Sequence, residues 1–339
     1  MRHTVILTGD VNLRNVTDPS RPFELVGDTL RGADVVFGNL EGCLYDSDEA
    51  IPYKPGWYHA GSRPAPALQM GGFHSVGCAN NVTFGREATM STLARLDEMG
   101  IAHTGAGVDA ASAHAPVVLK RDRFRIGFLQ YSSVFWPIGH EATESSPGIA
   151  ALKAHTAYQP NPRILEMPGG PATVVTWPDP AYLERFRQEI RSLRGLADVV
   201  VVSVHWGISG SDETAQYQSA IGHEAVDAGA DLVMGHGPHV IQAIEVYRDR
   251  AIFYSLGNFF FGWERLARDW VGLMVRVDVE DRKIARVACS PVRPNSDGQT
   301  ALRSLDDERE AMMALARLSQ RYDTSLDFGR DEAVVWERE

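Results

Sequence analysis

Two segments decide the fold of this chain: Val202-Ser203-Val204-His205-Trp206-Gly207 and Gly235-His236-Gly237-Pro238-His239-Val240. Each includes or follows a short apolar run, at residues 199–204 and 231–234. Such runs predict buried strands whose carboxyl ends face a crevice, the usual position for ligands in sheets covered by helices. One histidine alone is usually a hydrogen-bonded loop residue. Three at neighbouring strand ends predict a metal site, because imidazole is a common ligand of zinc, iron and manganese.

The composition is that of a globular protein: 339 residues, 44% hydrophobic and 23% charged. A net charge of −11 with scattered Lys and Arg argues against nucleic-acid binding, which needs a basic stripe. The N-terminal apolar run is too short for a signal peptide, and no stretch approaches the ~18 apolar residues of a membrane span. Cys43, Cys78 and Cys289 lack CxxC spacing and indicate reduced, buried thiols. We therefore expect a cytoplasmic protein without nucleic-acid or membrane partners.

Strand and helix patterns alternate along most of the chain. Apolar runs with polar tips predict strands at residues 4–8, 34–37, 73–77, 125–131, 199–204, 231–234 and 251–255. Amphipathic runs predict helices at residues 87–99, 180–193, 213–228 and 308–321. Residues 270–279 and 284–291 predict an antiparallel pair, and the acidic tail is expected to be loosely held. This order is typical of an α/β protein.

Residues 136–180 interrupt this alternation, because they are rich in proline, glycine and aromatic residues and have no clear period. The strand pattern resumes after them, so we expect an inserted active-site loop or lid rather than a linker. We expect one domain over residues 1–290, which contains this insertion. A C-terminal extension over residues 291–339 is expected to pack one helix on that domain.

Polar side chains at the expected strand ends form a candidate metal centre. They are Asp10, Glu41, Asn80, Asn81, His205, His236 and His239. Carboxylates, an amide oxygen and imidazoles are a mixed ligand set that can hold two divalent ions with one carboxylate bridging them. Two such ions activate a shared water and stabilise negative charge on a substrate oxygen. The set therefore predicts hydrolysis, or acyl or phosphoryl transfer.

Six blocks of sequence carry a resemblance to a known family: Gly9-Asp10, Gly38-Asn39-Leu40-Glu41, Ala79-Asn80-Asn81, His205-Trp206-Gly207, Gly235-His236-Gly237-Pro238-His239-Val240 and Tyr254-Ser255-Leu256-Gly257-Asn258-Phe259. In this order they resemble the CapA family of capsule and poly-γ-glutamate biosynthesis proteins, within the calcineurin-like metallophosphoesterase superfamily. The resemblance covers residues 4–262. It implies a four-layer α-β-β-α sandwich of the metallo-dependent phosphatase type, with the metal site at the strand ends.

The resemblance also implies a role for each ligand of two divalent ions, which would be manganese, iron or zinc. Asp10 would ligate the first ion, Glu41 would bridge, and Asn81 would ligate the second ion. Three histidines would complete the coordination: His205, His236 and His239. Asn81, His205 and His239 are the candidate catalytic residues.

Two positions depart from the family pattern. Asn12 stands where the wider superfamily has the histidine of an Asp-x-His motif, and it is a candidate weak ligand. Val82 stands where the family has a histidine that contacts the substrate as general acid or electrostatic stabiliser. Valine can do neither, so phosphatase activity should lose much of the ~10²- to 10⁴-fold that general acid catalysis supplies. Loop histidines that could substitute are His59, His103, His140 and His155.

The basic, aromatic segment after Glu41 resembles a family loop, and its Lys54 and Arg63 could hold an anionic group of the substrate. Asn80 and Asn258 complete the expected substrate-binding set, and Asn258 is expected to orient a ligand rather than bind metal. Trp206 is expected to be a wall. The family's capsule-assembly members often carry a membrane anchor, which is not seen here, so we expect a small-molecule role in the cytoplasm.

We therefore expect a metal-dependent hydrolase or transferase acting on an amide, ester or phosphoester of an anionic small molecule. Three alternatives stay open from sequence alone. One is an amide-forming ligase or transferase in polyglutamate-like or natural-product biosynthesis, although no GxxxxGK[ST] loop is present. The others are an iron-dependent oxidative enzyme and a non-catalytic, metal-dependent binding module.

Overall fold

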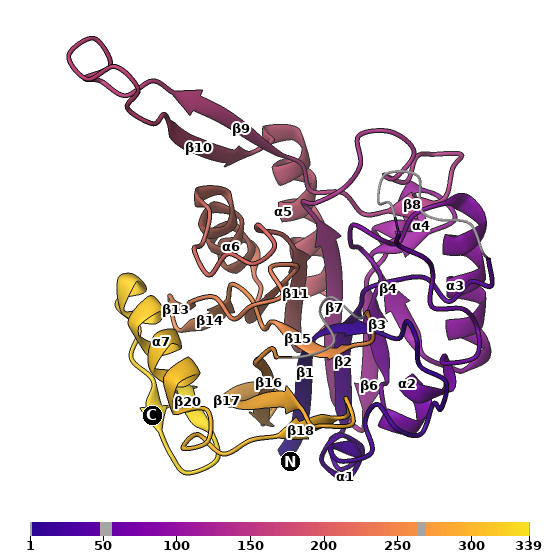
Figure 1. Cartoon of the computed structure of the whole chain (residues 1–339). Helices are drawn as coiled ribbons and strands as arrows, with labels where there is room; N and C mark the ends of the chain where they lie inside the picture. The colour runs from indigo at the N-terminus through magenta and orange to yellow at the C-terminus, as the bar shows by residue number, and fades with distance from the viewer. Residues whose placement is uncertain (1, 48–55, 264–268, 339) are drawn as a thin grey trace.

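The computed structural model describes residues 2–47, 56–263 and 269–338. Two β-sheets stack face to face, and helices cover the outer face of each sheet (Figure 1). The predicted α-β-β-α sandwich is confirmed. Within the described residues no helix is long and apolar enough to cross a membrane.

The first sheet has ten strands in the described residues, and β1 lies at its centre. Its strands are β1 (Arg2–Asn12), β2 (Val35–Leu40), β3 (Ser75–Gly77), β4 (Ala102–Thr104), β15 (Asn258–Phe261), β16 (Gly272–Glu280), β17 (Lys283–Pro294), β18 (Thr300–Leu302), β19 (Asp327–Phe328) and β20 (Ala333–Glu337). The strands β1 to β4 run parallel, so their carboxyl ends meet at one edge.

The second sheet has six strands in the order β13-β14-β12-β11-β7-β6. They are β6 (Val117–Arg121), β7 (Phe124–Ser132), β11 (Val199–His205), β12 (Leu232–His236), β13 (Ile244–Tyr247) and β14 (Arg250–Phe253). Because β11 and β12 are parallel neighbours, His205 and His236 face each other in register at their ends. The two sequence segments that predict the fold therefore lie side by side.

Alternation along β1 explains how one strand serves two cores. Val5 and Leu7 pack between the sheets, whereas Ile6 packs outward against the first helical layer. Successive side chains on a strand point to opposite faces, so a strand buried on both faces reads as a continuous apolar run. Between the sheets, the rings of Phe37 and Phe128 stack with centroids 4.5 Å apart.

Helices form the two outer layers. On the first sheet lie α1 (Gly27–Arg31), α2 (Pro66–Gly71) and α3 (Arg86–Glu98), and on the second sheet lie α5 (Pro180–Arg194) and α6 (Gln216–Ala228). The start of α5 follows from its sequence: Asp179 accepts hydrogen bonds from two backbone N–H groups of the first turn, and Pro180 occupies the first helical position. Short α4 (Ala110–Ala113) lies beside the two-residue strands β5 (Ala106–Gly107) and β8 (Gly148–Ile149).

The insertion at residues 136–180 is more ordered than expected. Its middle forms a hairpin of β9 (Ala154–Gln159) and β10 (Thr173–Pro178) that projects from the body (Figure 1). The sequence has no alternating pattern that would predict this hairpin, because neither strand has a buried face. Apolar Tyr158 and Val174, for example, are both exposed. The inserted loop or lid therefore contains regular secondary structure at residues 154–159 and 173–178.

The C-terminal residues are built into the sandwich. The expected boundary between residues 290 and 291 falls inside β17, and β20 pairs with β17 along the sheet. The expectation of a loosely held tail is wrong for residues 333–337. Helix α7 (Arg309–Ser319), followed by the 3₁₀ turn η1 (Gln320–Tyr322), buries Met312 and Leu315 in the core between the two sheets.

Candidate metal centre

Parallel pairing of β1 and β2 brings the first two acidic residues together. Asp10 pairs with Asn39 in register, and Glu41 follows β2 directly. A bulge in β1 precedes Asp10, and a side chain at Gly9 would place its Cβ 2.0 Å from the Gly257 carbonyl oxygen. Glycine is required there because the loop before β15 approaches so closely that the Asp10 N–H donates to the same carbonyl at 3.0 Å.

Asp10, Glu41 and His239 form a buried triad. One ligand atom of each lies within 4.8 Å of the others, and no further His, Cys, Asp or Glu in the described ranges joins them. His239 Nδ1 lies 3.3 Å from an Asp10 oxygen, and His239 Nε2 lies 3.7 Å from a Glu41 oxygen. His239 also adopts a left-handed backbone conformation with φ 61°, a strain that persists mainly at functional sites.

The charges of the triad fit a divalent cation. Burial alone would raise the pKa of Asp10, but the hydrogen bond and charge of His239, with the charges of His236 and His205, lower this pKa to about 2. Burial favours neutral His239, but Glu41 and Asp10 outweigh it and raise the His239 pKa to about 9. Two buried carboxylates thus create a position for positive charge, which a proton or a metal ion can occupy.

His205 and His236 lie close enough for their charges to act on Asp10, and Asn81 carries a further buried oxygen atom. The His205 and His236 rings stack with centroids 6.4 Å apart. His236 Nε2 contacts Ser203 Oγ at 2.6 Å, while His236 Nδ1 and Asn81 Oδ1 are buried without a hydrogen-bond partner in the described residues. Burial lowers the His236 pKa to about 4, so this imidazole stays neutral. Neutral imidazole and orphaned amide oxygen are donors that a divalent ion would satisfy.

Two residues without an expected role hold Asp10 in place. Asn39 Nδ2 donates to Asp10 Oδ1 at 2.7 Å, and Gln130 Nε2 on β7 donates to Asn39 Oδ1 at 2.8 Å. Gln130 Oε1 accepts from the Ala79 N–H at 2.5 Å. Asn39 lies inside the Gly-Asn-Leu-Glu block, so its position in that block could have indicated a role in the site. Nothing in the sequence around Gln130 indicates its contact across the sheets.

The three other asparagines of the predicted site have different partners. Asn80 Oδ1 accepts from the N–H groups of Val82 and Thr83, and its Nδ2 donates to the Leu40 carbonyl at 2.8 Å. Asn80 therefore shapes the turn that carries Asn81. Asn12 donates to the Glu41 carbonyl at 2.6 Å, so its amide holds backbone. Asn258 Oδ1 lies 3.1 Å from His239 Nδ1, which suits the expected orienting role.

Val82 is fully buried in an apolar cluster with Trp57 and Phe261, flanked by Phe84 and Trp263. Phe261 in turn packs edge-on against His239, with centroids 4.9 Å apart. The position of the missing family histidine is thus enclosed by aromatic side chains beside the triad. A polar group at residue 82 would enter an apolar environment.

Of the four loop histidines, His140 is the one packed near the Asn81 turn. It is 1% exposed and lies edge-on to Phe84, and its Nδ1 accepts from the Trp136 N–H at 3.1 Å. Trp136 Nε1 donates to the Asn81 carbonyl at 3.2 Å. Trp136, at the start of the insertion, therefore holds the backbone of Asn81, a candidate metal ligand. His59 packs against Tyr45, while His103 and His155 contact carboxylates of Asp97 and Asp179.

The remaining predicted residues include one outside the described ranges. Arg63 is exposed, and its charge acts on Asp18. Lys54 lies outside the described residues. Trp206 is fully buried in the core cluster beneath α5 and α6, and its Nε1 donates to the Tyr254 carbonyl at 2.6 Å. Cys43, Cys78 and Cys289 are buried and free, as expected.

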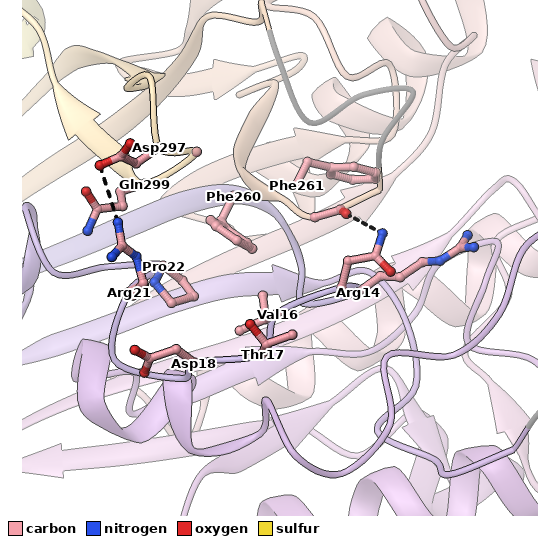
Figure 2. A pocket seen from close by; sticks show the side chains of 13 residues that line it. Arg14, Val16, Thr17, Asp18, Arg21, Pro22, Phe260, Phe261, Asp297 and Gln299 are labelled. Atoms are coloured by element: carbon pink, nitrogen blue, oxygen red, sulfur yellow. Dashed lines mark hydrogen bonds and ion pairs between the residues drawn. The ribbon is translucent and has the colours of Figure 1, made fainter.

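A cavity of about 280 Å³ is lined by Phe261 among other residues, and Figure 2 shows the side chains around it. Phe260, Val16 and Pro22 form its walls, and Arg21 at one side pairs with Asp297 at 3.3 Å. None of the candidate metal ligands lines it. This cavity is therefore separate from the centre that the sequence predicts.

The chain matches the family described as bacterial capsule synthesis protein PGA_cap over residues 4–263. It belongs to this family. The chain is 32% identical to an uncharacterised protein, y4sH, of Sinorhizobium fredii, over 76% of this chain and 66% of that protein. It is 30% identical to capsule biosynthesis protein CapA of Bacillus anthracis, over 72% of this chain and 54% of that protein. The chain thus spans less than two thirds of either relative.

Among solved structures, a phosphatase from Mycoplasma pneumoniae superposes with a TM-score of 0.48 at 14% identity, over 86% of this chain and 93% of that one. The predicted CapA-family membership is confirmed by the family match, which covers nearly the range expected from the six blocks.

Proposed function

We propose that this protein is a metal-dependent enzyme that hydrolyses or transfers an amide, ester or phosphoester group of an anionic small molecule. The observation that carries the proposal is the buried triad of Asp10, Glu41 and His239, with ligand atoms within 4.8 Å of one another. Buried carboxylates this close repel one another unless a positive charge lies between them.

The ligands divide between two divalent ions in this proposal. Asp10 and His239 would hold the first ion, and Glu41 would be shared between the two. Three further side chains would hold the second ion: Asn81, His205 and His236. Bound manganese, iron or zinc would polarise a substrate oxygen and lower the pKa of a coordinated water.

The protein's own residues keep the donors in place. Asn39 and the Gly237 N–H, which donates to Asp10 Oδ2 at 3.2 Å, fix the Asp10 carboxylate. Asn258 orients His239, and Trp136 fixes the backbone of Asn81. Such outer partners preorganise a site, so little rearrangement is needed when substrate binds.

Val82 restricts the substrates in this proposal. No proton can come from residue 82, and His140 is buried with its Nδ1 engaged by Trp136. The favoured substrates therefore have leaving groups that depart without protonation, such as activated esters or phosphoesters of acidic alcohols.

A non-catalytic metal-dependent binding role is the second candidate, and the enclosure of Val82 by aromatic residues favours it. The experiment is elemental analysis of protein purified without added metal, followed by turnover of p-nitrophenyl acetate and bis(p-nitrophenyl) phosphate after loading with manganese, iron or zinc. Close to two ions per chain with ester turnover supports the enzyme. Metal without turnover of either compound supports the binding role, and absence of metal overturns both.

We also propose a cytoplasmic location, which the three free, buried cysteines support.

A further inference from the structure

A cavity of about 360 Å³ adjoins the metal centre. His239 and Asn258 of the centre line it, and so do residues of α7, a helix far away in sequence. The walls between them are apolar: Val240, Ile241, Trp270 and Val271. The volume lies within the roughly 300–1,000 Å³ of small-molecule sites. The cavity is thus large enough for part of a substrate.

One wall belongs to a segment outside the family match, which ends at residue 263. Helix α7 turns Met312 and Leu315 into the core, while half-buried Ala311 and Ala314 line the cavity. Met313 lies on the opposite side of the helix and is 47% exposed. The small alanines leave the space that larger side chains would fill.

Two lining residues carry buried donors without partners in the described residues. They are Nδ2 of Asn258 and Nε1 of Trp270. Both side chains are more than nine-tenths buried. Buried N–H groups are nearly always hydrogen-bonded, so an acceptor oxygen from a ligand would satisfy them.

The charges around the cavity select against a second anion. Among its lining residues in the described ranges, Asp212 and Asp269 are carboxylates and none is Lys or Arg. Arg293 offsets one of them, with a 3.2 Å ion pair to Asp269. A polyanion entering this cavity would meet carboxylates rather than cations.

We propose that this cavity binds an uncharged apolar group of the substrate, an acyl chain or aromatic ring bearing an acceptor oxygen, and that α7 sets its maximum size. This proposal rests on the proposed function, since it places the reacting group at the triad. It names a substrate with one anionic end and one apolar end.

The test compares Ala314→Trp, which fills the cavity, with Met313→Trp on the exposed face of the same helix. Manganese-loaded enzymes are assayed with p-nitrophenyl acetate, butyrate, hexanoate and octanoate. For the unmodified protein, kcat/KM should rise about fourfold per added methylene until the cavity is full. Ala314→Trp should lower kcat/KM for octanoate at least tenfold more than for acetate, with metal content unchanged, while Met313→Trp keeps the original pattern. Equal loss on all four esters, or no dependence on chain length, would overturn the proposal.

If no ester is turned over, the proposed hydrolysis fails, but the cavity's proposed ligand can still be tested by measuring binding. The probes are then octanamide, which is uncharged with an acceptor oxygen, and suberate, a dianion of similar length, measured by calorimetry on the metal-loaded protein. Octanamide should bind to the unmodified chain and to Met313→Trp but at least tenfold more weakly to Ala314→Trp. Suberate can bind through a carboxylate at the metal centre without entering the cavity, so Ala314→Trp should weaken its binding little. Equal weakening of suberate and octanamide by Ala314→Trp, or no octanamide binding, would overturn the cavity's assignment.

Discussion

Gln130 and Asn39 connect the two sheets directly behind the metal centre. Gln130 Nε2 donates a hydrogen bond to Asn39 Oδ1 at 2.8 Å, and Asn39 Nδ2 donates to Asp10 Oδ1 at 2.7 Å. All three side chains are buried, so each hydrogen bond replaces one to water. The metal centre therefore depends on the packing of one sheet against the other.

Gln130→Leu should weaken both the metal centre and the fold. It leaves Asn39 and the Ala79 N–H without their partner, so we expect a loss of about 1–3 kcal/mol in unfolding free energy. Metal affinity should fall about 10- to 100-fold, as for outer partners of metal ligands. Urea unfolding and metal titration measure the two effects.

Gln188→Leu, on the exposed face of α5, is the matched control. Unchanged metal affinity in Gln130→Leu would contradict the role of this chain of hydrogen bonds.

Removal of a proposed ligand should remove metal. We expect Glu41→Ala and His205→Ala each to lose most bound ion, measured by elemental analysis, because Glu41 would bridge and His205 would complete the second set. A chelator should lower the melting temperature of the unmodified protein, since ion binding stabilises only the folded state. It should have little effect on either variant. His155→Ala, which alters a histidine in the hairpin, should retain full metal content. Full metal in both ligand variants would defeat the assignment.

Replacing Val82 by the family's histidine should increase phosphodiester hydrolysis and lower the free energy of unfolding. Val82→His places an imidazole among Trp57 and Phe261, where burial of an unpaired polar group costs about 1–3 kcal/mol. A proton donor beside the triad should raise hydrolysis of bis(p-nitrophenyl) phosphate by ~10²-fold. Val82→Gln is the control, because it is polar but cannot donate a proton as an acid. A folded, metal-loaded Val82→His without a faster rate would show that the valine is not what limits this reaction.

The sequence allowed prediction of the parts of the fold that are locally encoded. The strands carrying Asp10, His205 and His236 are apolar runs with polar tips, and their carboxyl ends meet as expected. The β9–β10 hairpin has no continuous buried face to create a period, and β20 depends on pairing with the distant β17. The Asn39–Gln130 contact and the wall formed by Ala314 are products of tertiary packing, which no local pattern encodes.

Stability should fall on acidification partly through His140. Burial lowers the pKa of this imidazole to about 4, against 6.5 for the exposed group. Between these values the unfolded chain binds a proton that the folded chain does not, so stability present above pH 6.5 is lost as the pH falls toward 4. The loss of unfolding free energy through His140 reaches about 2 kcal/mol near pH 5.

His140→Gln lacks the titrating group and should lose less stability than the unmodified protein between neutral and mildly acidic pH. The measurement is urea unfolding at both pH values with chelator present, so that metal release does not contribute. Parallel losses in the two proteins would mean that His140 is not kept neutral by its surroundings.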